Sequence, residues 1–363
     1  MKKILVGFDV SPLYSGHKVR GIGFYTERLL EGLKGFRDLE IRELRSKKEV
    51  DEANYDLLHI PYFHPYFFTL PFRKKGPLVV TIHDLIPVKY PEHYPPGIKG
   101  RLRWEIQRGL LQRVDLVITD SFASKSDIAR LTGYPKERIH VVYLAADDVF
   151  RVIKSKRILR EIKEKYRLPE KFVLYVGDVN WNKNVPGLVR ACRAIGAPLV
   201  IVGKQAVRDD FDPTHPENKD LAWLKKMKER HTPYILNSKF YILTLGFIPT
   251  EDLVAIYNLA TVYCQPSFDE GFGLPVIEAM ACGCPVVASN RGSLPEVVGK
   301  AAILTKPEVK DLAEAVKSLL QDEKKRRGLA SLGLKKANEF SWQKAAQDTY
   351  FLYKSLIAGR LRH

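Results

Sequence analysis

The chain has 363 residues, of which 45% are hydrophobic and 28% are charged. This length exceeds what one hydrophobic core usually serves, so we expect two domains, and the composition excludes a disordered or fibrous protein. Lys and Arg number 59 against 42 Asp and Glu, which gives a formal net charge of +17. Such a surface favours an anionic partner (nucleic acid, acidic lipid or a phosphorylated substrate), although a Lys- and Glu-rich surface adapted to heat would need none.

The cysteines and the apolar stretches bear on location. None of the four cysteines forms a C-x-x-C pair and the chain is too long to need disulfides, which indicates a reducing compartment. No zinc pattern appears. The N-terminal MKKILVGFDV has too short an apolar run for a signal peptide and is predicted to be a buried strand. No stretch approaches the roughly 18 apolar residues of a membrane span. We therefore expect a cytoplasmic protein that can meet a membrane only peripherally, at its inner face.

In the first half of the chain, apolar strand-like runs alternate with helical spacing. The predicted strands cover residues 4–10, 55–60, 78–83, 115–119 and 139–143. The predicted helices cover residues 21–33, 101–112 and 124–131. This alternation predicts a parallel sheet built from βαβ units. A charged stretch at 151–167 then reads as a linker with a surface helix.

The second half repeats this alternation around an irregular insertion at 205–238. Its predicted strands cover residues 172–176, 199–202, 240–245, 262–265 and 285–288. Its predicted helices cover residues 185–194, 251–260, 275–282 and 311–320, with a last helix from the cap Ser341 toward Leu356. We predict an α/β fold of two Rossmann-like domains, residues 1–160 and 161–344, with the helix at 345–363 packing back on the first. Their parallel sheets would face each other across a cleft that holds the active site.

The segment PSFDEGFGLPVIEAMACGCP, residues 266–285, is the most informative part of the sequence. Gly271 and Gly273 follow a predicted strand and would let the backbone approach a ligand closely. Pro275 suits the first position of a helix, and Gly283 would end that helix. A glycine-bearing loop that opens a helix makes an anion site, because free N–H groups and the helix dipole point at the ligand.

Two carboxylates frame this predicted anion site. Glu270 lies in the loop and Glu278 lies about one turn inside the helix, with seven residues between them. Each carboxylate can accept paired hydrogen bonds from hydroxyl groups. We therefore expect one to bind a sugar and the other a ribose.

The segment closely resembles the E-x7-E signature of the retaining glycosyltransferases of family 4, which have the GT-B fold. The resemblance continues along nearly the whole chain, ends with FSW at 340–342, and points to the mannosyltransferase-like and O-antigen-type branch. It is carried by GIGFYTERLL (21–30), TIHDLIP (81–87), DSFASKSDI (120–128), VLYVGDVNWNKN (173–184), LGFIPTEDLVAIYNLA (245–260) and SNRGSLPEVVG (289–299). The combination is specific, whereas a single glycine motif would be weak.

The resemblance implies roles for the carboxylates and the loop between them. Glu270 would bind hydroxyls of the transferred sugar, and Glu278 would bind the nucleotide ribose. The donor sugar and diphosphate would meet the backbone of Gly271, Phe272, Gly273 and Leu274.

The resemblance also implies roles outside this segment. Lys183 would neutralise the diphosphate leaving group, and Gly21 and Gly23 would face the donor phosphates and the acceptor. His83 would lie near the anomeric carbon. Many family members carry an Arg after the glycine that corresponds to Gly177, but this sequence has Asp178 there. Arg291 is one basic residue that could compensate.

The implied reaction is transfer of a hexose, with mannose from GDP-mannose favoured, to a glycan or polyprenyl-linked acceptor with retention of configuration. Neither a metal nor another cofactor is expected. Because no carboxylate nucleophile is evident, we favour front-face attack, in which the departing phosphate deprotonates the acceptor hydroxyl.

Some features have competing interpretations. Asp210 and Asp212 mimic a D-x-D metal motif but lie in the polar insertion, where a solvated loop is the better interpretation. The aromatic run at 61–68 could line the acceptor site, touch lipid or fill the core. Residues 99–113 combine Arg and Lys with aliphatic residues, which suits either an interfacial amphipathic helix or a packed helix with a solvated face.

Two other functional classes are weighed against transfer. A GT-B phosphorylase or a sugar-nucleotide epimerase is the enzyme alternative, but no pyridoxal-phosphate lysine context is found for a glycogen-type phosphorylase. A nucleic-acid-binding protein is the non-enzyme alternative, suggested by the charge alone. No helix-turn-helix, zinc-finger or RNP motif accompanies that charge, so we expect no nucleic-acid partner.

Overall fold

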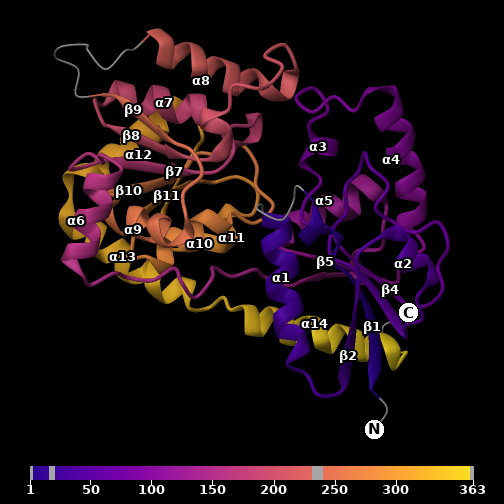
Figure 1. Cartoon of the computed structure of the whole chain (residues 1–363). Coiled ribbons are helices and arrows are strands. Elements are labelled where there is room, and N and C mark those ends of the chain that lie inside the picture. The colour runs from indigo at the N-terminus through magenta and orange to yellow at the C-terminus, as the bar shows by residue number, and fades with distance from the viewer. Residues whose placement is uncertain (1–2, 16–20, 231–239, 360–363) are drawn as a thin grey trace. The chain divides into compact units, whose positions relative to one another are not determined.

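The computed structural model describes residues 3–15, 21–230 and 240–359, which fall into two compact units (Figure 1). The first unit runs to Ala145 and includes the chain from Phe340 onward, and the second spans Ala146–Glu339. The boundary between the two units after Ala145 therefore lies before the predicted boundary at residue 160. The backbone N–H of Ile153 donates to Asn258 Oδ1 at 2.8 Å, and Asn258 Nδ2 donates to the Arg151 carbonyl at 2.9 Å. These bonds fasten the stretch that was predicted as a linker to the second unit.

The first unit contains a six-stranded parallel sheet in the order β2-β1-β3-β4-β5-β6. The strands are β1 (Ile4–Asp9), β2 (Leu39–Leu44), β3 (Leu57–Ile60), β4 (Leu78–Thr81), β5 (Leu116–Thr119) and β6 (Ile139–Val141). The sequences LVVT of β4 and LVIT of β5 are buried throughout. Such continuous apolar runs are typical of parallel strands covered on both faces.

Serine side chains cap some of the helices of the first unit. They are α1 (Gly21–Lys34), α2 (Lys47–Glu52), α3 (Ile86–Lys89), α4 (Gly97–Leu111), α5 (Phe122–Thr132) and α14 (Trp342–Ile357). Ser121 caps α5 by accepting from the Ser124 N–H, and Gly133 ends α5 in the left-handed region at φ 70°. Ser341 caps α14 as predicted, accepting from the Lys344 N–H.

The second unit contains a six-stranded parallel sheet in the order β12-β11-β10-β7-β8-β9. The strands are β7 (Val173–Val176), β8 (Leu199–Val202), β9 (Ile242–Leu245), β10 (Val262–Gln265), β11 (Val286–Ser289) and β12 (Ile303–Thr305). In chain order this is the 3-2-1-4-5-6 arrangement of a dinucleotide-binding fold. The strand order reverses between β7 and β10, which lie side by side at the centre of the sheet.

Three helices of the second unit were not predicted, those at Lys219–Arg230, Leu294–Val298 and Glu323–Ala337. The helices are α6 (Lys156–Lys165), α7 (Val185–Ala194), α8 (Lys219–Arg230), α9 (Thr250–Leu259), α10 (Leu274–Ala281), α11 (Leu294–Val298), α12 (Val309–Gln321) and α13 (Glu323–Ala337). The prediction of an irregular insertion at 205–238 was wrong where α8 forms. Leu221 and Leu224 share one face of α8 and are buried in the core cluster of this unit. Residues 231–239 of the insertion lie outside the described part of the chain.

The C-terminal helix α14 packs against α1, where Figure 1 shows the two helices side by side. The rings of Phe36 and Tyr350 stack with centroids 4.2 Å apart, and Asp38 accepts from Tyr350 at 2.8 Å and from Lys354 at 2.7 Å. Within the described residues, no helix has both the length and the apolar character needed to cross a membrane.

The contact between α1 and α14 predicts opposite effects of one substitution at two helical glycines. A Cβ on Gly32 would lie 2.5 Å from Ala346 Cβ, whereas a Cβ on Gly109 of α4 would meet nothing within 4 Å. In an open helix position, replacing Gly by Ala stabilises by roughly 0.5–1 kcal/mol. We expect Gly109→Ala to raise the urea midpoint and Gly32→Ala to lower it, because overpacking costs about 1–3 kcal/mol. Equal midpoints for the two variants would contradict the packing described.

Candidate functional site

The predicted donor-binding residues of the second unit lie at the carboxyl ends of β7 and β10. The loop after β7 spans residues 177–184, and the loop after β10 spans residues 266–273. In the sheet, β8 lies next to β7 on one side, and β11 lies next to β10 on the other side. Open parallel sheets bind their ligands at such a switch point, outside the carboxyl ends of the strands.

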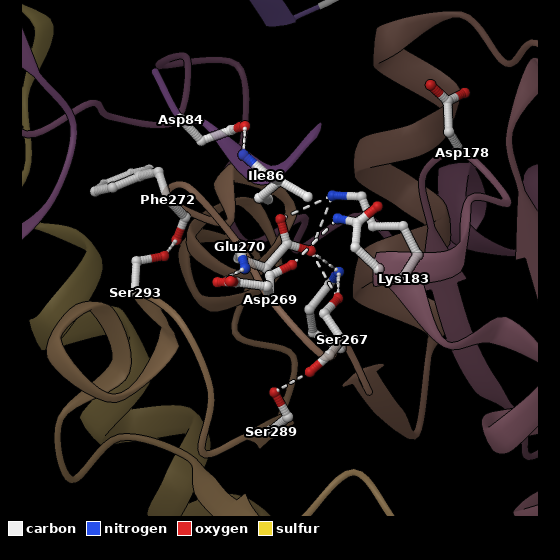
Figure 2. A network of polar contacts seen from close by, with 12 residues as sticks. Asp84, Ile86, Asp178, Lys183, Ser267, Asp269, Glu270, Phe272, Ser289 and Ser293 are labelled. Carbon is white, nitrogen blue, oxygen red and sulfur yellow. Dashed lines mark hydrogen bonds and ion pairs between the residues drawn. The ribbon is translucent and has the colours of Figure 1, made fainter. Parts of the chain in front are cut away.

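Glu270 and Lys183, predicted separately, form an ion pair (Figure 2). Lys183 Nζ donates to both carboxylate oxygens of Glu270, at 2.9 Å to Oε1 and 2.8 Å to Oε2. Gln265 Nε2 and Ser267 Oγ each donate to Oε1 at 2.7 Å. Glu270 is only 6% exposed, so these donors replace the water that its charge would otherwise bind. Oε2 keeps capacity to accept from a ligand hydroxyl.

Asparagines from the loop after β7 hold the loop after β10 in place. Asn182 Nδ2 donates to the Asp269 carbonyl at 3.1 Å, and the Phe268 N–H donates back to the Asn182 carbonyl at 2.7 Å. Asn184 Nδ2 donates to the Pro266 carbonyl at 3.0 Å. Asn182 and Asn184 are both buried, so their amides serve this loop rather than solvent. The position of Glu270 therefore depends on two neighbouring loops at once.

The turn after β11 also helps to hold the loop that carries Glu270. Gly292 has φ 57°, and a Cβ there would lie 2.5 Å from both Asp269 Oδ1 and the Glu270 nitrogen. The Ser293 N–H donates to the Glu270 carbonyl at 3.1 Å, and Ser293 Oγ donates to the Phe272 carbonyl at 2.9 Å. Only a glycine fits this close approach of two backbone segments.

The glycine loop opens α10 as predicted, with a shift of one residue. The helix begins at Leu274, so Pro275 occupies its second position rather than its first. Gly273 precedes it at φ 95°, a conformation that favours glycine, while Gly271 and Phe272 are buried beside it. Gly283 follows the helix at φ 71°, as expected of a left-handed C-terminal residue. The N–H groups of the first turn of α10 face the same end of the sheet as Glu270.

Glu278, in α10, is held by a tyrosine that no motif in the sequence marked. Tyr257 of α9 donates its hydroxyl hydrogen to Glu278 Oε2 at 2.8 Å. Burial raises the pKa of Glu278 to about 7, against the lowering effect of the Tyr257 hydrogen bond, and Asp147 raises it further. Near neutral pH a carboxyl group with this pKa is divided between the protonated form and the carboxylate, and only the carboxylate can accept two hydroxyl hydrogen bonds at each oxygen.

Asp178 does not join the Glu270 cluster. Figure 2 shows its carboxylate apart from Lys183 and Glu270. Its backbone carbonyl accepts from the Tyr175 hydroxyl at 2.6 Å, which fixes the turn after β7. Arg291, named as a compensating cation, is exposed in the turn before Gly292.

The remaining predicted residues, Gly21, Gly23 and His83, belong to the first unit, and their roles stay predictions. Gly21 and Gly23 lie in the first turn of α1, and Tyr25 of the same helix packs edge-on against His83 with centroids 4.7 Å apart. His83 Nδ1 lies 2.7 Å from Asp120 Oδ2. Burial alone would lower the pKa of His83, but the buried Asp120 carboxylate outweighs it and raises that pKa. The sequence did not reveal Asp120 as a partner of His83, because α3, α4 and β5 separate the two residues in the chain.

A buried polar chain connects this part of the first unit with α14. His59 Nε2 and the Tyr25 hydroxyl each lie 2.9 Å from Thr81 Oγ1, and His59 Nδ1 is hydrogen-bonded to the Tyr353 hydroxyl. Burial lowers the pKa of His59 to about 3, so its ring is neutral and can donate on one side and accept on the other.

The part of the chain that the structure describes contains no cluster of side chains suited to a metal ion. Among residues 3–15, 21–230 and 240–359, no group of three or more His, Cys, Asp and Glu side chains could hold a metal ion. Asp210 and Asp212, the D-x-D lookalike, are exposed, and Asp212 accepts from the Thr214 N–H at 2.8 Å. This is the solvated turn expected for them.

Comparison with known proteins identifies the family to which the chain belongs. A model of the group 1 glycosyl transferases matches residues 159–336, and a model of Glycosyltransferase Family 4 matches residues 15–149. O-antigen chain mannosyltransferase B of Escherichia coli is 34% identical over 305 residues, which cover 81% of this chain and 74% of that protein. The serotype-specific mannosyltransferase WbdA of Escherichia coli is 31% identical over 74% of this chain, which spans about a third (32%) of WbdA.

The fold has close relatives among solved structures. Sucrose-phosphate synthase from Thermosynechococcus elongatus superposes with a TM-score of 0.76 at 21% identity, over 98% of this chain and all of that chain (100%). The two six-stranded parallel sheets are those of the GT-B architecture, which confirms the predicted fold class. The chain belongs to the family 4 glycosyltransferases, with O-antigen mannosyltransferases among its relatives.

The close approach at Gly292 yields a test of how Glu270 is held. Gly292→Ala should displace Glu270 and lower turnover of a nucleotide sugar by about tenfold or more, since misplacing a binding group costs that much. Gly299→Ala is the matched control, because Gly299 also has a left-handed φ of 53° but its Cβ would meet nothing within 4 Å. Gly292→Ala should also lose more stability than Gly299→Ala, because only its Cβ meets another backbone segment. Equal turnover in the two folded variants would show that Gly292 does not position Glu270.

Proposed function

We propose that the protein transfers mannose from GDP-mannose to a hydroxyl of a glycan or polyprenyl-linked acceptor, with retention of the anomeric configuration. The observation that carries this proposal is the buried Glu270 carboxylate, held by Lys183 beside the opening of α10. The mannosyltransferases among the relatives favour mannose over other hexoses.

Glu270 and Lys183 suit the two halves of an activated sugar. Oε2 of Glu270 accepts from Lys183 and has a remaining lone pair for a sugar hydroxyl. Lys183 carries the positive charge that a diphosphate requires, and its ammonium group contacts both carboxylate oxygens of Glu270. The pair thus sets a carboxylate toward hydroxyls and a cation toward phosphate within one hydrogen-bonded cluster.

The same cluster argues for front-face attack. Glu270 accepts four hydrogen bonds, which lowers the nucleophilicity expected of a residue that forms a covalent sugar intermediate. In our proposal the acceptor oxygen bonds to the anomeric carbon while the bond to the diphosphate breaks, and the hydroxyl proton passes to the departing phosphate. Lys183 and the first turn of α10 stabilise the charge on the leaving group, and we propose that no metal is required.

The proposed acceptor implies a cellular location and a set of partners. A polyprenyl-linked acceptor would place the reaction at the inner face of the cytoplasmic membrane. The partners would then be a nucleotide sugar and a lipid-linked or free glycan.

Donor hydrolysis with a panel of GDP-, UDP- and ADP-sugars tests the function. We expect turnover of GDP-mannose above the others, and Glu270→Ala should lower kcat/KM by about 10- to 100-fold, because a hydrogen bond to a charged group contributes about 1.5–3 kcal/mol. Glu314→Ala, at an exposed position of α12, is the control and should leave turnover unchanged.

Three outcomes would reject the proposal. Cleavage of a mannoside by free phosphate to give mannose 1-phosphate would indicate a phosphorylase, and epimerised nucleotide sugar would indicate an epimerase. Full activity of Glu270→Ala would remove the carboxylate from the mechanism.

Glu278 predicts how nucleotide binding depends on pH. Its pKa of about 7 means that it is protonated below neutral pH and a carboxylate above it. If the carboxylate accepts from the ribose, GDP affinity should fall by up to about tenfold for each pH unit below 7 and level off above. Isothermal titration calorimetry should show weaker, less pH-dependent binding for Glu278→Gln. The same pH slope in wild type and Glu278→Gln would show that another group is responsible.

A further inference from the structure

Helix α4 of the first unit carries a stripe of aliphatic side chains that face solvent. Ile98 is 89% exposed, Leu102 63% and Ile106 37%. These positions are four residues apart, so they lie on one face of the helix along about 12 Å of its axis. Gly100, Gln107 and Leu111 are buried on the opposite face. The aliphatic stripe, Ile98, Leu102 and Ile106, therefore points away from the unit that carries it.

The buried face of α4 fixes this orientation through Gln107. Gln107 Oε1 accepts from the backbone N–H groups of Thr69 at 2.8 Å and Leu70 at 3.2 Å, and Gln107 Nε2 donates to the carbonyls of His64 and Phe67. Gln107 itself is 0% exposed. Rotating the helix to bury the aliphatic stripe would leave these polar groups unpaired, so α4 cannot hide the stripe within its own unit.

Cations border the aliphatic stripe on both sides. At 100° per residue, Lys99 lies along one edge and Arg101 and Arg108 along the other, and all three are exposed. Glu105, the one acidic residue of α4, lies between the aliphatic stripe and these two arginines, and it pairs with Arg108 at 2.5 Å. Arg103 extends the surface toward the 61% exposed Phe67, with its Cζ 5.8 Å from the ring centroid.

We propose that the aliphatic stripe of α4 inserts into the headgroup region of an anionic lipid bilayer while the bordering Lys and Arg side chains contact lipid phosphates. An outward apolar face bordered by cations is the arrangement that binds such an interface. The net charge of +17 has the same sign. A nucleic acid would use the cations but not three exposed aliphatic side chains. This inference goes beyond the proposed transfer reaction and requires neither its donor nor its acceptor.

Co-sedimentation of the full chain with vesicles tests the docking. We expect binding to vesicles of phosphatidylcholine mixed with phosphatidylglycerol, weakened by salt, and little binding to phosphatidylcholine alone. Ile98→Ser/Leu102→Ser/Ile106→Ser should lower the partition coefficient by at least about tenfold, since binding scales with the apolar area buried. The matched control replaces three exposed aliphatic residues of other helices: Ile158→Ser/Leu332→Ser/Ile357→Ser.

A fluorescent label gives a second readout at the stripe itself. The four native cysteines are buried, so a cysteine introduced at an exposed position can be labelled selectively. An environment-sensitive dye on Ile98→Cys should shift to shorter wavelengths with anionic vesicles, and a dye on Leu332→Cys of α13 should not. Thermal unfolding of each variant shows that the fold is retained.

The proposal is overturned by any of three results. One is wild-type protein that does not bind anionic vesicles. Another is a stripe variant that binds as tightly as the control variant. The third is a stripe that mediates self-association, seen as a smaller sedimentation coefficient of the stripe variant with unchanged vesicle binding. Since none of these assays uses a nucleotide sugar, their failure would leave the proposed transferase activity standing.

Discussion

The second unit is organised around the need to satisfy one buried charge, the carboxylate of Glu270. A buried carboxylate is costly unless it is paired and fully hydrogen-bonded. Its partners come from two neighbouring strands: Lys183 from the loop after β7, and Gln265 and Ser267 from the end of β10 and the loop that follows. Satisfying the charge therefore requires both loops at the switch point to be in place, and it gives the unit a carboxylate and an ammonium group already oriented before a ligand arrives.

The central strands of both sheets were predictable, and so were the edge strands β6 and β9, but the opposite edges were not. LVVT of β4 and LVIV of β8 are continuous apolar runs that few other structures would explain. β2, with the sequence LEIREL, and the three-residue β12 escaped prediction. Both lie at sheet edges. Charged residues interrupt the apolar pattern of β2, and β12 has only three residues, of which the middle one is exposed. Helix α8 was missed because its buried Leu221 and Leu224 are outnumbered by Lys and Glu.

The candidate site was only partly within reach of the sequence. Lys183 and Glu270 were both selected, but as separate ligands for phosphate and sugar, and their direct contact follows from the pairing of β7 with β10, which no local pattern encodes. Gln265 and Ser267 were overlooked because a buried amide or hydroxyl has no signature until its partner is known. The same holds for Asp120, which meets His83 through the pairing of β4 with β5, and for Gly292, whose constraint is the backbone of another loop.

The most direct measurement is a crystal structure of the protein with an intact nucleotide sugar, using GDP-mannose and a non-hydrolysable analogue. The account predicts sugar hydroxyls within hydrogen-bonding distance of Glu270, the diphosphate beside Lys183 and the first turn of α10, and the ribose at Glu278. A nucleotide sugar bound elsewhere, with Glu270 still contacted only by Lys183, Gln265 and Ser267, would contradict it.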